Sequence, residues 1–231
     1  MQRLIYGRRK GHRLRPGRQR LLDELLPKLR VQPPEGATLE PASLFAPRPQ
    51  RIWLEIGFGG GEHLAAQAAA HPEVGLIGCE PFIGGVARLL SLIAAQGLAN
   101  VRLFTDDARL LLQALPDACL ERVFVLFPDP WPKTRHHKRR IVNPQTAAEF
   151  VRLLRPGGEV RLATDDMGYA RAMLLALRAR PELQWQARRA ADWRGRPADW
   201  PGTRYENKAL AGRRACVYLR FVRAVGGPEK P

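Results

Sequence analysis

From residue 51 onward, the chain alternates between short apolar patterns typical of buried strands and patterns typical of helices. The alternation predicts strands at 51–56, 74–80, 100–104, 121–127, 158–164 and 215–223, and helices at 61–70, 82–96, 108–114, 143–154 and 167–180. Strands separated by helices form βαβ units. The sequence therefore predicts an α/β fold, with a mostly parallel sheet and helices on both of its faces.

Composition limits the class of protein. The chain has 231 residues, of which 45% are hydrophobic and 26% charged, which suits one globular domain with extensions or two small domains. No run of 18 uncharged apolar residues occurs, so we expect no membrane partner, and the first ten residues lack the apolar stretch of a signal peptide. The scattered cysteines at 79, 119 and 216 predict reduced structural thiols in a cytoplasmic protein, not a disulfide framework or a metal site.

The first 50 residues differ in character from the rest. Residues 1–20 contain no acidic side chain and are interrupted by glycine and proline, which predicts a basic arm followed by a short helix around 18–29. Five prolines between 32 and 50 predict a connecting segment. We therefore expect an N-terminal extension, 1–50, and a main domain, 51–231, with basic loop insertions, of which the longest is expected at 188–213.

The positive charge is clustered. The formal net charge is +16, yet residues 1–30 carry ten basic and two acidic side chains, residues 133–140 five and none, and residues 188–223 ten and three. The net positive charge of these three segments together exceeds that of the whole chain, so the remaining residues are net negative. Clustered cations outside a predicted core indicate a surface that binds a polyanion such as a nucleic acid.

A glycine-rich turn follows the first predicted strand. Residues 55–61 are EIGFGGG, and glycines there let the backbone approach a ligand closely. A dinucleotide fingerprint needs a third glycine at position 62, which is Glu62, and a phosphate-binding P-loop needs Gly-Lys-Ser/Thr, which is missing. The turn therefore disfavours pyrophosphate binding.

The E-x-G-x-G-x-G turn resembles the first motif of class I methyltransferases that use S-adenosyl-L-methionine. Glu80 ends the second predicted strand, where a carboxylate can bond ribose hydroxyls, and Asp107 follows the third, where one can accept a hydrogen bond from an adenine amino group. The alternative is a turn that only joins a strand tightly to a helix, with two unrelated surface acids.

The fourth predicted strand runs into FPDPWPK, residues 127–133, and then into TRHHKRR, residues 134–140. Three prolines in five positions make a rigid loop that holds Asp129 beside the expected cofactor site. The alternative is a proline turn followed by a solvated charge run.

PDPWPKTRHHKRR resembles the signature of the bacterial tRNA (guanine-N7-)-methyltransferase family, and TRYENK at 203–208 resembles another segment of that family. The resemblance covers about residues 51–223. It implies a Rossmann-like class I methyltransferase with a mostly parallel seven-stranded sheet, which transfers a methyl group from S-adenosyl-L-methionine to N7 of guanosine 46 in the tRNA variable loop, without a metal. A monomer and a homodimer both remain open.

The resemblance also implies site residues. The catalytic residue would be Asp129, and the cofactor would contact Glu55, Gly57, Gly59, Glu80, Asp107 and Asp129. The substrate would contact Lys133, Asp165, Thr203, Arg204, Tyr205 and Glu206, and RNA would contact Arg135, His136, His137, Lys138, Arg139 and Arg140. From the residues alone, the two histidines are solvated loop residues.

The chemistry of guanine N7 fits this assignment. N7 carries an in-plane lone pair and no proton, so its methylation needs alignment but no general base. Because positive charge moves onto the purine, fixed carboxylates near the base stabilise the transition state. N7 must stay free, so we expect Asp129, Asp165 or Glu206 to accept from the N1–H and N2–H₂ donors of guanine, and the cationic run to grip phosphates.

Three alternatives remain. The first is a methyltransferase that acts on another RNA base or on a protein side chain, and the second is a non-catalytic RNA-binding module. A nicotinamide dehydrogenase ranks last, because the third fingerprint glycine is missing.

Overall fold

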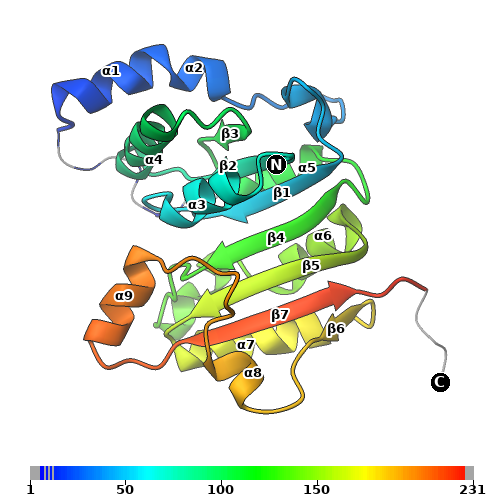
Figure 1. Ribbon diagram of the computed structural model, residues 1–231. Helices are drawn as coiled ribbons and strands as arrows, with labels where there is room; N and C mark the ends of the chain where they lie inside the picture. Colours follow the sequence, from blue (N-terminus) through cyan, green and yellow to red (C-terminus); the bar gives the residue numbers. More distant parts are fainter. Residues whose placement is uncertain (1–5, 8, 10, 12, 227–231) are drawn as a thin grey trace. The chain divides into compact units, whose positions relative to one another are not determined.

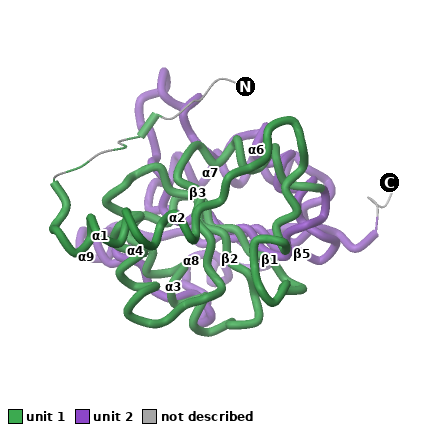
Figure 2. Tube along the Cα trace, turned by 90° about the horizontal axis from the view of Figure 1, so that it is seen from above, with its two compact units in different colours: residues 1–116 green, residues 117–231 purple. Residues whose placement is uncertain are grey.

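The computed structural model describes the chain except for residues 1–5, 8, 10, 12 and 227–231 (Figure 1). Parts of the predicted basic arm, 1–20, therefore lie outside the described residues. The chain forms two compact units, residues 1–116 and 117–231, which are coloured separately in Figure 2. This boundary follows packing; the predicted division into an extension, 1–50, and a main domain, 51–231, stays a prediction.

Unit 1 contains three parallel strands, β1 (Arg51–Ile56), β2 (Val74–Cys79) and β3 (Val101–Phe104), in the order β3-β2-β1. All of β2 and all of β1 except Arg51 are buried, as expected for a parallel sheet covered on both faces. The strands alternate with helices α3 (Glu62–Ala70), α4 (Ile83–Gln96) and α5 (Ala108–Ala114). Each of these elements lies within a residue or two of its predicted position.

The N-terminal part of unit 1 is folded onto this sheet. The helix expected around 18–29 is two helices, α1 (Pro16–Glu24) and α2 (Leu26–Leu29), and α1 packs against α4 (Figure 1). Pro16 starts α1, since proline is tolerated in the first turn of a helix. After α2, the Val31 amide donates to the Leu103 carbonyl of β3 at 2.8 Å.

The proline-rich connector is also packed. It contains a 3₁₀ turn, η1 (Pro41–Leu44), and its side chains Leu39 and Phe45 are buried. The guanidinium of Arg102 lies 4.7 Å from the centre of the Phe45 ring and donates to the Leu44 carbonyl at 2.7 Å. The segment is therefore an integral part of unit 1.

Unit 2 contains four strands, β4 (Leu120–Leu126), β5 (Leu154–Thr164), β6 (Leu183–Trp185) and β7 (Val217–Arg223), in the order β4-β5-β7-β6. β4 and β5 are parallel, whereas β7 is antiparallel to both β5 and β6. Helices α6 (Pro144–Leu153) and α7 (Met167–Arg178) lie behind this sheet in Figure 1, and the short α8 (Ala191–Arg194) lies in front. The prediction of helices on both faces is thus confirmed in this unit.

Two sequence predictions are wrong in unit 2. The segment 188–213, expected to be a loop, contains α8 and a two-turn helix, α9 (Arg204–Ala211). No strand was expected at β6, because three residues are too few to show a period. With β6 the strands number seven in the described part of the chain, one more than the residue patterns predicted and the number that the family resemblance implies. No helix in that part is long and apolar enough to cross a membrane.

We predict that Gly85→Ala destabilises the protein. A methyl group on Gly85 would lie 2.1 Å from the backbone oxygen of Gly59 and 3.0 Å from its carbonyl carbon. Because these are backbone atoms, the turn or α4 must shift to make room. Overpacking of this kind costs about 1–3 kcal/mol in the free energy of unfolding, measured by urea titration. The control is Gly17→Ala in α1, where nothing lies within 4 Å of the new methyl group and a small gain in stability is expected. Equal stability of Gly85→Ala and the wild type would contradict the prediction.

Candidate active site

The glycine-rich turn joins β1 to α3 in a conformation that only glycine adopts freely. The φ angles of Gly57, Gly59 and Gly61 are +75°, +55° and +78°. The Gly57 amide donates to the Cys79 carbonyl of β2 at 2.8 Å, which ties the turn to the neighbouring strand. Gly57 is exposed, and a Cβ there would meet nothing within 4 Å, so the turn leaves open space beside the end of β1.

Glu80 holds this turn in place. One carboxylate oxygen accepts from the Gly59 amide at 2.8 Å, and the other accepts from the Phe82 amide at 2.9 Å. The side chain thus connects the glycine turn to the start of α4. The two hydrogen bonds fix the orientation of the Glu80 carboxylate beside the turn.

Asp107 occupies the corresponding place after β3. It caps the N-terminus of α5, where Oδ1 accepts from the Arg109 amide at 3.1 Å, and it also pairs with the Arg109 guanidinium at 3.1 Å. Glu55, Glu80 and Asp107 follow the order of the three parallel strands, whose carboxyl ends share one edge of the sheet. Unit 1 therefore brings together the predicted carboxylates and the glycine turn.

The thiol at the end of β2 plays no chemical part in this group. Burial, together with the charges of Glu80 and Asp107, raises the pKa of Cys79, so the thiol stays protonated and unreactive. None of Cys79, Cys119 and Cys216 forms a disulfide bond.

In unit 2, Asp129 lies exposed in a strained loop after β4. Phe127 and Trp131 flank it with φ angles of 50° and 44°, which are rare for residues other than glycine and persist only where surrounding contacts enforce them. The Arg140 side chain supplies one such contact, since its Nε donates to the Pro130 carbonyl at 2.8 Å. Arg139 supplies another, with its guanidinium 4.9 Å from the centre of the Trp131 ring.

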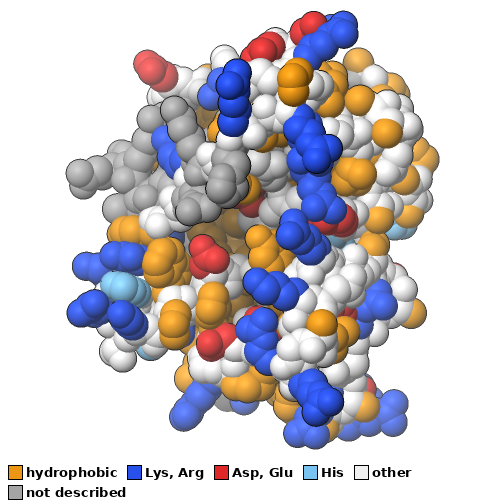
Figure 3. Space-filling view, turned by 90° about the vertical axis from the view of Figure 1, so that its left-hand side faces the viewer, with side chains coloured by type: hydrophobic (Ala, Val, Ile, Leu, Met, Phe, Trp, Pro, Cys, Tyr) orange, Lys and Arg blue, Asp and Glu red, His pale blue; other side chains and the backbone are white. Residues whose placement is uncertain are grey.

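The cationic run that follows is divided between two environments. Thr134–Arg139 form a 3₁₀ turn, η2. Exposed side chains are those of Lys133, just before the turn, and of Arg135, His137 and Lys138 within it. Arg140, by contrast, is 7% exposed and stacks on Tyr169 at 4.7 Å. The contacts of Arg140 hold the proline loop, whereas the exposed cations are free to meet solvent or a polyanion. On the face drawn in Figure 3, Lys and Arg side chains are far more frequent than Asp and Glu side chains.

His136 sits beside these cations. Partial desolvation, together with the charges of Arg139, Lys133 and Lys138, lowers the pKa of its imidazole below the ordinary value for histidine. A neutral ring is therefore favoured near neutral pH, and it packs edge-on against Trp131 with centroids 5.9 Å apart.

The Thr-Arg-Tyr-Glu segment at 203–206 starts α9. Thr203 accepts from the Glu206 amide at 3.0 Å and the Glu206 carboxylate accepts from the Thr203 amide at 3.3 Å, which is a capping box. Arg204 and Tyr205, between them, are exposed. The T-x-x-E spacing is a sequence signal for a helix start, and it could have located α9 within the segment expected to be a loop.

Glu206 is buried, with 3% of its surface exposed. Besides closing the capping box, its carboxylate accepts from the Tyr218 hydroxyl of β7 and pairs with the Arg196 Nε at 3.1 Å. Burial and the neighbouring Glu206 charge raise the pKa of Tyr218, which keeps its hydroxyl protonated as a donor. Asp165, after β5, is less buried and pairs with Arg214 at 2.7 Å.

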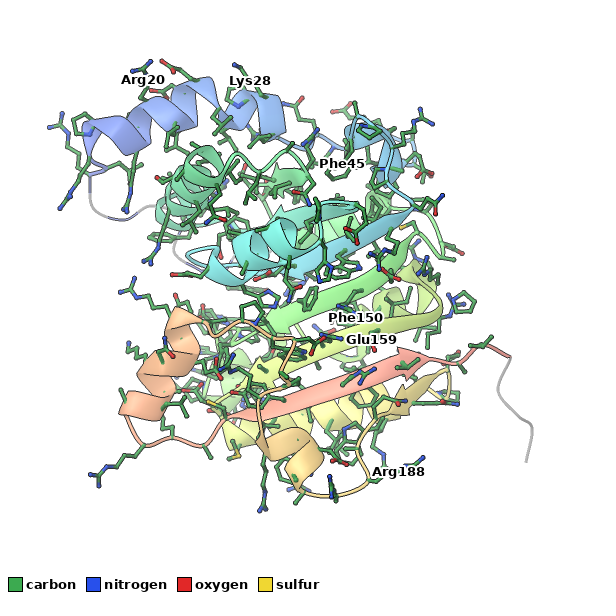
Figure 4. The ribbon with its side chains drawn as sticks, viewed as in Figure 1. Arg20, Lys28, Phe45, Phe150, Glu159 and Arg188 are labelled. Atoms are coloured by element: carbon green, nitrogen blue, oxygen red, sulfur yellow. The ribbon has the colours of Figure 1, made fainter. Side chains whose placement is uncertain are left out.

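A further ionic cluster, which the sequence reasoning missed, lies on β5. Arg161 is 4% exposed and its Nε donates to Glu159, labelled in Figure 4, at 2.9 Å. A second nitrogen of Arg161 donates to Asp199 at 2.6 Å, which ties the segment before α9 to the strand. Charged residues two apart in a strand share a face, so the G-E-V-R pattern at 158–161 was the available signal.

The chain matches the family model described as "Putative methyltransferase" over residues 49–218. The tRNA (guanine-N(7)-)-methyltransferase of Rhodospirillum rubrum is 57% identical over 223 residues, covering 95% of this chain and 87% of the relative. The protein of that name from Paramagnetospirillum magneticum is 49% identical over 222 residues, covering 95% and 93%. This chain belongs to the tRNA (guanine-N(7)-)-methyltransferase family. The family resemblance found in the sequence is thus confirmed.

Solved structures confirm the fold of this family member. An aminoglycoside resistance methyltransferase, NpmB1, is 18% identical with a TM-score of 0.50, covering 76% of this chain and 88% of the other. An rRNA methylase from Streptococcus thermophilus is 10% identical with a TM-score of 0.51, covering 75% and 87%. These likenesses establish the Rossmann-like class I methyltransferase fold with its mostly parallel sheet. Among the described residues, no group of three His, Cys, Asp or Glu side chains is arranged to hold a metal ion.

We predict that Glu206 contributes to stability. Glu206→Gln replaces a buried carboxylate that accepts from the Tyr218 hydroxyl and pairs with the Arg196 guanidinium, so the free energy of unfolding should fall by about 1.5–3 kcal/mol. Asp165→Asn is the matched control, because its ion pair with a half-exposed arginine is worth at most about 1 kcal/mol. Thermal and urea unfolding of both variants measure the difference. Similar stabilities for the two variants would assign Glu206 no anchoring role.

Proposed function

We propose that this family member transfers the methyl group of S-adenosyl-L-methionine to N7 of guanosine 46 in the variable loop of tRNA, giving 7-methylguanosine. The observation that carries the proposal is the group in unit 1, in which Glu55, Glu80 and Asp107 lie at or shortly after the carboxyl ends of three parallel strands, with the glycine turn after the first of them. Relatives 57% and 49% identical are named for methylation of tRNA guanine at N7.

The residues of unit 1 fit this cofactor. Glu80, held by two backbone amides, would accept from ribose hydroxyls, and Asp107 would accept from the adenine amino group. Gly57 and Gly59 would let the backbone approach it, and Asp129 of unit 2 is proposed as a further contact. When bound, S-adenosyl-L-methionine supplies an electrophilic methyl group on a sulfonium sulfur.

Guanine N7 needs no base to remove a proton. As the bond from the methyl carbon to sulfur breaks and the bond to N7 forms, positive charge moves onto the purine. We propose that the Asp129 carboxylate, fixed in its strained loop, stabilises that charge as the catalytic residue. Lys133, Asp165, Thr203, Arg204, Tyr205 and Glu206 are proposed to form or support the substrate site. Of the carboxylates proposed to accept from N1–H and N2–H₂, the accessible Asp129 and Asp165 are favoured over the buried Glu206.

The exposed part of the cationic run is proposed to bind RNA phosphates. Arg135, His137 and Lys138 are exposed, and His136 and Arg139 are half-buried beside them. Arg140 is proposed to act mainly by holding the proline loop. In unit 1, Lys28 extends outward from α2 (Figure 4) and adds a cation to the surface, whereas Arg20 of α1 pairs with Glu24 at 2.9 Å.

Methyl transfer to unmodified tRNA tests the proposal. We expect label from methyl-labelled S-adenosyl-L-methionine at N7 of guanosine 46, detected by chemical cleavage at 7-methylguanosine, and no label in a transcript with adenosine at position 46. Label on another base or on a protein would overturn the substrate. No transfer and no cofactor binding would leave a non-catalytic RNA-binding module.

Salt dependence tests the role of the exposed cations. Replacing both Arg135 and Lys138 by glutamine in one variant should reduce the slope of the logarithm of the tRNA binding constant against the logarithm of the salt concentration by about 1.5. Each phosphate contact contributes about 0.7–0.9 to that slope. Filter binding of tRNA between low and moderate salt measures the slope. Arg140→Gln is the control: we expect lower stability of the fold with a smaller change in slope. An unchanged slope in the double variant would reject phosphate contacts at these positions.

A further inference from the structure

A buried histidine that the proposed mechanism does not use lies behind the glycine turn. His63, in the first turn of α3, is 2% exposed, and its Nδ1 lies 2.7 Å from Oε2 of Glu55 at the end of β1. Glu55 is itself only 3% exposed. Because both groups are removed from water, this hydrogen bond controls the orientation of the carboxylate.

Gln67, one helical turn further along α3, lies next to this imidazole. Its amide nitrogen lies 3.3 Å from His63 Nε2. An ionised carboxylate accepts and does not donate, so the proton of the His63–Glu55 hydrogen bond lies on Nδ1. The Gln67 amide faces the other ring nitrogen, where it can donate to Nε2. The three side chains form a chain of donors running from Gln67 through His63 to Glu55.

The other carboxylate oxygen of Glu55 is available. Among the described residues, Oε1 receives no hydrogen bond. A carboxylate with one oxygen fixed presents the second in a defined direction beside the glycine turn. Since ribose hydroxyls and the adenine amino group are matched by Glu80 and Asp107, the donor left for Glu55 is the ammonium of the amino-acid part of the cofactor.

We propose that His63 is a positioning residue for cofactor binding. It holds Glu55 so that Oε1 accepts from the ammonium group of S-adenosyl-L-methionine, and Gln67 keeps the imidazole in the donating tautomer. This inference rests on the proposed function, because it takes S-adenosyl-L-methionine as the ligand.

Calorimetric titration of the full chain with S-adenosyl-L-methionine tests the inference. His63→Leu fills the buried site with an apolar side chain of similar size and removes the donor to Glu55. It should weaken binding of S-adenosyl-L-methionine about tenfold, the effect of losing one hydrogen bond to a charged group. Glu55→Gln should weaken binding at least as much. Because His63 acts through Glu55, the double variant should bind no more weakly than Glu55→Gln alone. The affinity for tRNA should be the same as that of the wild type in all three variants. A variant that had lost its structure would instead bind tRNA more weakly as well.

Two further variants sharpen the test. His63→Asn keeps an N–H donor near the position of Nδ1 and should restore binding close to that of the wild type. His71→Asn is the control at the end of the same helix, where the ring packs against Trp53, and it should have no effect on cofactor affinity. If His63→Leu does not fold, Gln67→Met takes its place, since it removes only the donor to Nε2 and should still weaken cofactor binding without affecting tRNA.

Three results would overturn the inference while leaving the proposed function intact. They are unchanged cofactor affinity in folded His63→Leu and Gln67→Met, additive losses with Glu55→Gln, and an equal loss of tRNA affinity. A wild-type protein that fails to bind S-adenosyl-L-methionine would instead overturn the proposed function and this inference with it.

Discussion

The candidate site of unit 1 depends on one carboxylate that is shared between two pieces of backbone. Glu80 accepts hydrogen bonds from the Gly59 and Phe82 amides, and so connects the glycine turn after β1 to the start of α4. The approach of these two segments is so close that Gly85 has no room for a side chain. Both the open space beside the turn and the direction of the Glu80 carboxylate follow from this connection.

Arginine serves two purposes in this protein. A guanidinium offers its donors in a rigid plane, and because it is more weakly hydrated than an ammonium, its partial burial costs less hydration free energy. It can therefore donate to backbone carbonyls and pair with carboxylates inside the fold. Arg161 and Arg140 act in this way, one by tying Asp199 to β5 and the other by holding the loop of Asp129. Net charge alone therefore overstates how many cations are available to RNA.

The residues of the family motifs likewise differ in what they do. In the segment 203–206, Thr203 and Glu206 close the first turn of α9, while Arg204 and Tyr205 remain exposed. In the segment 129–140, Asp129 and Lys138 are exposed while Arg140 is buried. A motif can thus combine residues that build a local structure with residues that the structure presents.

The sequence by itself determined the order of the elements and predicted where a site would lie. Buried parallel strands leave long apolar runs, and carboxylates or glycines directly after such runs lie at one edge of the sheet, which is why Glu55, Glu80 and Asp107 were predicted there; the structure joins Glu80 to the turn through the Gly59 amide. Local patterns did not reveal β6, which is too short to show a period, nor the helix hidden in an Arg- and Trp-rich segment. Only the tertiary structure decided which charged side chains are buried. The pairing of His63 with Glu55, of Arg161 with Asp199 and of Glu206 with Tyr218 joins residues on different elements, and burial depends on packing between elements that no local pattern records.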